Sequence, residues 1–175
     1  MRHAATCLAL FLCSACGIGG SSEPKRRYSN EAQGYVIAQP DGWTAWEHRG
    51  FAQLTPVRSK SMQRHTIVIR AAKKPQQVVD GKPTTDADLV AATERVLRAL
   101  PKSTLSTKAA FDGELKGVRF SLSFVPRGLT RPYRREHALL LGSTHVFHII
   151  YTSPSNEPMD EASFRTVVTT LSEEG

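Results

Sequence analysis

Residues 118–124 read VRFSLSF, and their apolar and polar residues alternate without a break. Val118, Phe120, Leu122 and Phe124 fall on one face of an extended chain, and an arginine and two serines fall on the other. Successive side chains of a strand point to opposite faces of its sheet, so the pattern predicts a strand with one face in a core and the other in solvent.

Two more strands are predicted directly after this one, at residues 134–141 and 145–152, with a turn at Gly142-Ser143 between them. The second carries apolar side chains on both faces, namely Phe147, Ile149 and Tyr151 on one and Val146 and Ile150 on the other. A strand of this kind lies inside a sheet that is covered on both sides. We therefore expect protein layers on both faces of the sheet.

The sequence before residue 118 predicts shorter strands, mostly in hairpin order. A turn at Pro40-Asp41-Gly42 ends the first of them, and Trp43 is expected to enter the edge of the core directly after it. Arg49-Gly50 is expected to join the next two as a hairpin. The predicted strands are residues 34–39, 43–47, 51–56, 65–72 and 105–110.

A helix is predicted over residues 85–100, because Thr85 and Asp88 have the spacing of a capping pair and Pro101 cannot continue a helix. Glu94 and Arg98 are four residues apart, in the order that favours an ion pair on a helix surface. The apolar face of this helix is expected to consist of Leu89, Ala92, Val96 and Leu100.

A second helix is predicted over residues 159–171, with Ser155 or Asn156 as the residue that caps its start. Its apolar side chains recur at helical spacing and should be buried against the sheet; they are Phe164, Val167, Val168 and Leu171. Together the patterns predict an α+β domain, with an antiparallel sheet of six to seven strands and helices packed on it.

The first thirty residues indicate export rather than folding. Arg2 and His3 precede an apolar run over residues 4–15 that is too short to cross a membrane, since a span needs about 20 residues. A Gly- and Ser-rich stretch follows. We therefore predict a signal peptide at residues 1–15, a tether at residues 16–30 and a single domain at residues 31–175.

Ser14-Ala15-Cys16-Gly17 resembles the lipobox of bacterial lipoproteins, although Cys13 stands where that family usually has leucine. The resemblance implies a diacylglycerol and palmitate-type anchor on Cys16. Gly17 in place of aspartate further implies the outer membrane, facing the periplasm. Ordinary cleavage near Ala15 and a retained apolar anchor are the alternatives. A redox role for Cys13 and Cys16 is disfavoured, because such a motif opens a helix inside a folded unit.

The chain after residue 16 has no cysteine, so an ordinary hydrophobic core must hold the domain together.

Residues 28–43, which include Tyr35-Val-Ile and Pro40-Asp-Gly-Trp43, are similar to the opening of PsbP-like and DcrB-like domains. The similarity extends over about residues 28–173, through a mid-chain helix, long hairpin strands and a closing helix. It implies an α/β/α sandwich that binds or assists other molecules, and it supplies no catalytic residue.

No catalytic, phosphate-binding or dinucleotide-binding motif occurs in the sequence. His145 and His148 should point to opposite faces of one strand, whereas His137 and His148 could meet across the Gly142-Ser143 turn. No carboxylate or cysteine completes a metal site there, so we expect neither a metal nor a cofactor. Glu173 and Glu174 are expected to be solvated at the end of the chain.

Basic residues offer the remaining candidate site. The net charge is +7, and removing Arg2 with the signal leaves about +6; an exported protein of this charge suits an acidic envelope protein or anionic lipid headgroups and not nucleic acid. A smaller group comprises Arg58, Lys60 and Arg64. The candidate contact surface consists of Arg127, Arg131, Arg134 and Arg135, whose alternative reading is a solvated loop.

The sequence therefore predicts a membrane-anchored envelope lipoprotein that acts as a non-catalytic binding or accessory module. The alternatives are a membrane-tethered enzyme whose site has no sequence motif and a chaperone-like secretion factor of the same fold.

Overall fold

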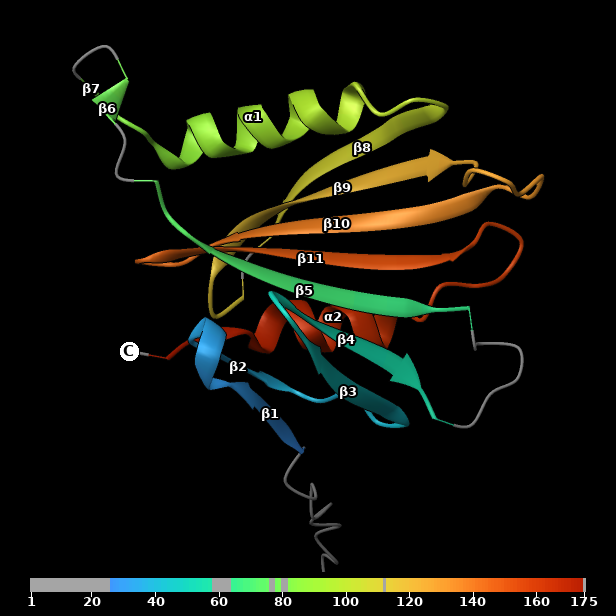
Figure 1. Ribbon diagram of the computed structural model, residues 1–175, viewed down its shortest axis with the longest axis horizontal. Coiled ribbons are helices and arrows are strands. Elements are labelled where there is room, and N and C mark those ends of the chain that lie inside the picture. The colour runs from blue at the N-terminus through green and yellow to red at the C-terminus, as the bar shows by residue number, and fades with distance from the viewer. Residues whose placement is uncertain (1–25, 58–63, 76–77, 80–81, 112, 175) are drawn as a thin grey trace, which may run out of the picture.

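The computed structural model describes residues 26–57, 64–75, 78–79, 82–111 and 113–174 (Figure 1). Cys16, the predicted signal peptide and the tether up to residue 25 lie outside the described residues. None of the described helices is long and apolar enough to cross a membrane.

Seven antiparallel strands form the main sheet, in the order β3-β4-β5-β11-β10-β9-β8. Two series of hairpins meet in this sheet, because β5 pairs with β11 across the middle while β3 and β8 lie at the edges. The strands are β3 Trp43–His48, β4 Phe51–Pro56, β5 Thr66–Lys73, β8 Ser103–Phe111, β9 Lys116–Phe124, β10 Tyr133–Leu141 and β11 His145–Pro154.

A second, three-stranded sheet, which the sequence did not predict, combines both ends of the described chain. Its order is β1 (Arg27–Asn30), β2 (Tyr35–Ala38) and β12 (Ser172–Glu173), with a 3-10 turn at Glu31–Gln33 between β1 and β2. Because β1 belongs to the fold, the ordered domain starts before residue 31, where we expected a tether. The short strands β6 (Val78–Val79) and β7 (Lys82–Pro83) form a separate pair.

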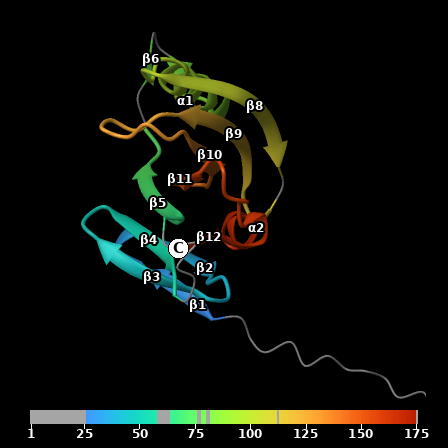
Figure 2. The ribbon, with the colours of Figure 1, turned by 90° about the vertical axis from the view of Figure 1, so that its right-hand side faces the viewer.

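The two helices lie on opposite faces of the main sheet (Figures 1 and 2). Helix α1 (Asp86–Arg98) packs mainly against β8 and β9, and Thr85 and Asp88 form the predicted capping box. Helix α2 (Glu161–Thr170) and the small sheet close the larger core on the other face. The fold is thus α+β with layers on both sides of the sheet.

One residue of the apolar face predicted for α1 was wrong, because Leu97 is buried in place of Val96. Val96 is 63% exposed, whereas Leu97 is 3% exposed and packs with Phe120 and Leu139. The cause lies in the sequence, since Val96 and Leu97 are adjacent and both suit a buried position. The predicted ion pair between Glu94 and Arg98 forms at 2.8 Å.

The start of α2 also differs from the prediction, because Asp160 caps the helix and neither Ser155 nor Asn156 does. The Asp160 carboxylate accepts a hydrogen bond from the backbone N–H of Ser163 and another from the indole N–H of Trp43. Trp43 itself is 3% exposed, as expected for the residue after the first turn. The buried face of α2 was predicted correctly: Phe164, Val167, Val168 and Leu171 all lie in the larger core.

The alternation in β9 is confirmed, and Ser123 on its polar face is exposed as predicted, but Arg119 and Ser121 on the same face are half-buried. Arg119 lies under α2 and forms ion pairs with Glu136 at 3.0 Å and with Glu161 at 2.5 Å. Ser121 donates a hydrogen bond to the same Glu136 carboxylate. This face of the sheet therefore carries a charge-compensated polar network, of which only Glu136 is buried.

Candidate functional site

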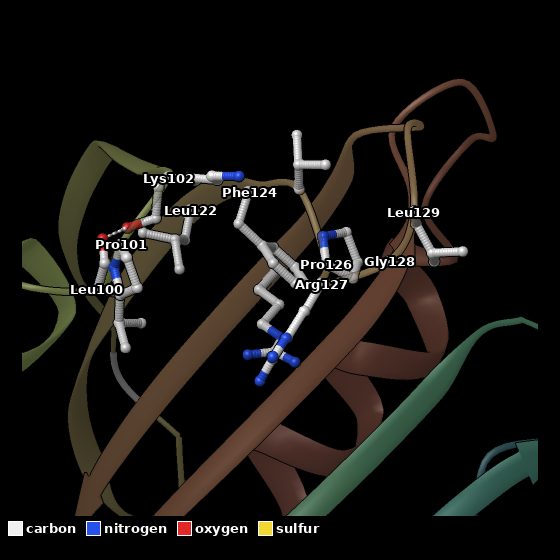
Figure 3. A pocket seen from close by; sticks show the side chains of 12 residues that line it. Leu100, Pro101, Lys102, Leu122, Phe124, Pro126, Arg127, Gly128 and Leu129 are labelled. Atoms are coloured by element: carbon white, nitrogen blue, oxygen red, sulfur yellow. Dashed lines mark hydrogen bonds between the residues drawn. The ribbon is translucent and has the colours of Figure 1, made fainter.

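A pocket of about 630 Å³ opens between the C-terminal end of α1 and the connection from β9 to β10 (Figure 3). We call it the loop pocket, and its volume falls within the roughly 300–1,000 Å³ that is usual for small-molecule sites. Most of its wall is apolar and comes from two sides that Figure 3 separates, with Leu100 and Leu122 on one and Phe124, Pro126 and Leu129 on the other.

Three cationic side chains line the same pocket, and among the described residues no acidic side chain does. They are Lys102, which follows α1, Arg127 in the β9–β10 connection, and Arg135 on β10. Lys102 adopts a left-handed backbone conformation, with φ of 55°, which is uncommon for a residue other than glycine. An apolar wall with cations and no counter-ion can accept a ligand that carries negative charge.

Arg135 is the half-buried member of this group. Its guanidinium carbon lies 4.2 Å from the centre of the Phe124 ring, a cation–π contact that fixes the side chain over the pocket wall. Burial lowers the pKa of Arg135, and repulsion from Arg70 lowers it further. Its Nε is buried without a hydrogen-bond partner among the described residues.

The structure brings only two of the four predicted arginines to this pocket. Arg127 and Arg135 line it, whereas Arg134 points to the opposite face of β10 because successive strand residues alternate. Arg131 is exposed in the connection and is not part of the pocket wall. In the second predicted group, Arg64 is exposed, and Arg58 and Lys60 lie outside the described residues.

Sequence reasoning missed a second pair of cationic and aromatic side chains on this face of the sheet. Arg70 on β5 is exposed, and its guanidinium lies 5.8 Å from the centre of the Phe51 ring. Arg70 stands opposite His148 in the β5–β11 register. No local signal could have placed Arg70 near Arg135, because only the strand order β5-β11-β10 brings them together.

His137 and His148 meet across the β10–β11 hairpin, as predicted. His137 Nδ1 lies 2.8 Å from His148 Nε2, and His137 Nε2 is buried without a partner within the described part of the chain. Burial, together with the neighbouring His148 and Arg135, lowers the pKa of His137 to about 3. Burial and Arg70 lower the pKa of His148 to about 4. Both rings are therefore neutral at physiological pH.

The described residues contain no group of three or more histidine, cysteine, aspartate or glutamate side chains arranged to hold a metal ion.

A row of hydrogen-bonded polar side chains, Tyr151, His65 and Glu157, has residue types that occur in catalytic sites. The Tyr151 hydroxyl lies 2.5 Å from His65 Nδ1, and His65 Nε2 lies 2.8 Å from Glu157. Tyr151 has no exposed surface, however, and burial raises its pKa to about 12. Its hydroxyl accepts a hydrogen bond from the backbone N–H of Asp160, so the row anchors the start of α2.

Glu173 is not solvated, which corrects the prediction for the C-terminal segment. Its side chain is 11% exposed and accepts hydrogen bonds from the backbone N–H groups of Ser143 and Thr144, at 2.6 and 3.0 Å. His145 Nδ1 lies 2.9 Å from the same carboxylate. Burial opposes ionisation, but these contacts outweigh it and hold the pKa of Glu173 well below its usual range. Glu174 is exposed and accepts a hydrogen bond from Ser29.

No protein-family model matches this chain, and no curated protein matches it in sequence. Solved structures share its fold. LpqN of Mycobacterium tuberculosis, described as involved in cell envelope biogenesis, superposes with a TM-score of 0.55 at 15% identity, over 89% of this chain and 88% of its own.

A protein from Bacteroides thetaiotaomicron superposes with a TM-score of 0.54 at 16% identity and covers 85% of this chain. This chain spans about half of that protein, 48% of its length. At such low identities the comparisons establish the fold that these proteins share and no function.

Proposed function

We propose that this chain is a lipid-anchored protein of the bacterial cell envelope and works there as a non-catalytic binding module. The lipobox-like segment at Cys16 and the resemblance to PsbP-like and DcrB-like domains support this proposal. The cell-envelope description of LpqN, which has the same fold, is compatible with it.

The loop pocket is the proposed binding site, and anionic lipid headgroups are its proposed partners. One observation carries this assignment: Lys102, Arg127 and Arg135 line an apolar pocket in whose wall the described part of the chain places no acidic side chain. Guanidinium groups bind phosphate and carboxylate through two parallel hydrogen bonds, so two arginines at one pocket favour an anionic ligand. An acidic envelope protein would use the same side chains and is the alternative that the test must separate.

The test uses a soluble chain that begins at Glu23 and lacks the predicted anchor. The buried apolar side chains of the described residues all lie between Tyr35 and Leu171, so this chain retains the complete core. Flotation with vesicles of phosphatidylglycerol should show binding that vesicles of phosphatidylcholine do not. The binding should weaken as salt rises, because exposed charges are screened within about 8–10 Å at physiological ionic strength.

Two double substitutions provide a matched comparison. Arg127→Gln with Arg135→Gln should abolish vesicle binding, whereas Arg131→Gln with Arg134→Gln removes the same charge from the same region and should leave most of it. Equal losses from the two pairs would show that the pocket has no special role. Capture of an acidic envelope protein, without vesicle binding, would transfer the site to the alternative partner.

A further inference from the structure

The uncovered part of the α1 face of the main sheet carries positive charge that no acidic side chain among the described residues balances. Helix α1 packs on the β8 and β9 side of the sheet, and its first residue, Asp86, forms an ion pair with Lys74, which directly follows β5 (Figures 1 and 2). Arg70 on β5 and Arg135 on β10 share this face, and we call them the basic patch. Neither forms an ion pair within the described part of the chain.

Arg119, on the opposite face of the same sheet, is an example of an arginine whose charge is balanced by ion pairs. Two carboxylates, Glu136 and Glu161, bind Arg119. By contrast, Arg70 and Arg135 repel each other, and two neutral histidines lie beside them in the sheet. An arrangement that keeps cations together without a counter-ion is unfavourable until an anion arrives.

Two buried polar atoms next to the patch also lack partners among the described residues. They are Nε of Arg135 and Nε2 of His137, which is 3% exposed. Buried polar groups are nearly always hydrogen-bonded in proteins, so unpaired ones point to a missing ligand or solvent molecule. Nε of Arg135 is a donor that a bound oxyanion could use.

Arg135 belongs to the loop pocket as well as to the basic patch. Its guanidinium stacks on Phe124, and both residues line the pocket. A ligand held by Arg135 therefore has a charged side chain at one end and an apolar cavity at the other, built from Leu100, Leu122 and Leu129. The half-exposed Leu129 (50%) and Val125 (37%) extend this apolar wall to the surface.

We propose that the loop pocket and the basic patch form one binding site for a single anionic amphiphile. Its phosphate or carboxylate head lies between Arg70 and Arg135, and its hydrocarbon chain enters the loop pocket. This inference rests on the proposed function and deepens it. It requires that the hydrocarbon chain of the ligand leave water or the bilayer and bind in the loop pocket, in addition to contact between the headgroup and the arginines.

The experiment titrates the soluble chain from Glu23 with three probes by calorimetry. Decyl phosphate, below its micelle concentration, carries both head and chain; decyl maltoside carries the same chain on a neutral head; inorganic phosphate carries the head alone. Decyl phosphate should bind at least about tenfold more tightly than either of the others, because only it fills both halves of the site.

Single substitutions locate the head. Arg70→Gln and Arg135→Gln should each weaken decyl phosphate binding by about tenfold, as expected for the loss of a charge-assisted contact. Arg134→Gln, one residue away on the other face of β10, should leave the affinity within about twofold. Arg70 is exposed, so its replacement keeps the test valid even if Arg135→Gln disturbs the fold.

Leu129→Ala tests the chain, because it should reduce the advantage of decyl phosphate over ethyl phosphate while leaving ethyl phosphate unaffected. Anion binding that depends on Arg127 and Arg135 but not on chain length or on Arg70 would overturn this inference and leave the proposed function standing. Failure of every anion to bind would overturn both.

The source of the amphiphile is tested separately with vesicles that contain fluorescent phosphatidylglycerol. Lipid that leaves the vesicles with the protein supports the inference with the membrane as the source. Binding of decyl phosphate without lipid transfer supports it with a free amphiphile as the ligand. Absence of both overturns it.

Discussion

Arg119 and Arg70 lie on opposite faces of one sheet, and their surroundings predict opposite effects of the same substitution. Arg119→Gln leaves the buried Glu136 (5% exposed side chain) without its cation and should lower the free energy of unfolding by about 2–4 kcal/mol. Arg70→Gln relieves repulsion with Arg135 and should leave the melting temperature unchanged or raise it. Urea unfolding of the two variants measures this contrast, and equal destabilisation by both would contradict it.

His137 and His148 predict a loss of stability in mild acid. Both bind protons below about pH 6.5 in the unfolded chain, but their folded pKa values are about 3 and about 4. Between about pH 6.5 and pH 4 the unfolded state binds more protons, so the free energy of unfolding falls as pH falls, by about 1.4 kcal/mol per unit of pKa shift at most.

Thermal melting between pH 7 and pH 5 measures this loss. A variant with both His137→Leu and His148→Leu removes both titrating rings at once. Its melting temperature should depend much less on pH. The interval above pH 5 separates this effect from the carboxylates Asp160 and Glu173, because a carboxylate with a lowered folded pKa costs stability only once the unfolded chain protonates it, near its ordinary pKa of about 4. Equal slopes for the variant and the natural chain would rule out the histidine pair as the cause.

Among the elements, α1 offers a direct test of which face it buries. Leu97→Ala should lower the free energy of unfolding by about 2–4 kcal/mol, because it leaves a cavity against Phe120 and Leu139. Val96→Ala changes an exposed neighbour and should stay within about 0.5 kcal/mol. Denaturation of the two variants checks the assignment, and the reverse order would restore the face expected from the sequence.

The elements also show what sequence patterns can establish. Strands β4, β9, β10 and β11 could be predicted because alternation is a local property, and their hairpin turns set the register. β1 and β12 could not be predicted, because the RYSN and SE segments have no apolar pattern and depend on pairing with β2. Only two of the four predicted arginines, Arg127 and Arg135, line the loop pocket. The sequence could not show this, because residue alternation does not tell which face of β10 borders a pocket.

At the scale of the whole molecule, the proposed membrane location depends on a lipid anchor on Cys16, which lies outside the described residues. Cys16→Ser should abolish fatty-acid labelling and release the protein from membranes, because the thiol is the proposed site of acylation. Cys7→Ser, which lies outside the lipobox-like segment, is the matched control, and it should keep both labelling and membrane association. Labelling that persists in Cys16→Ser would exclude the lipoprotein assignment.

The small sheet and α2 have a consequence for the timing of export. A chain that crosses a membrane from its N-terminus exposes β1 and β2 first, yet their partner β12 and the helix that covers Tyr35 and Ile37 are the last segments to arrive. The larger core therefore stays open until residue 171 has emerged. In the exported protein proposed above, the N-terminal strands would stay uncovered during that interval, and the packing of α2 and the pairing of β12 would complete the core last.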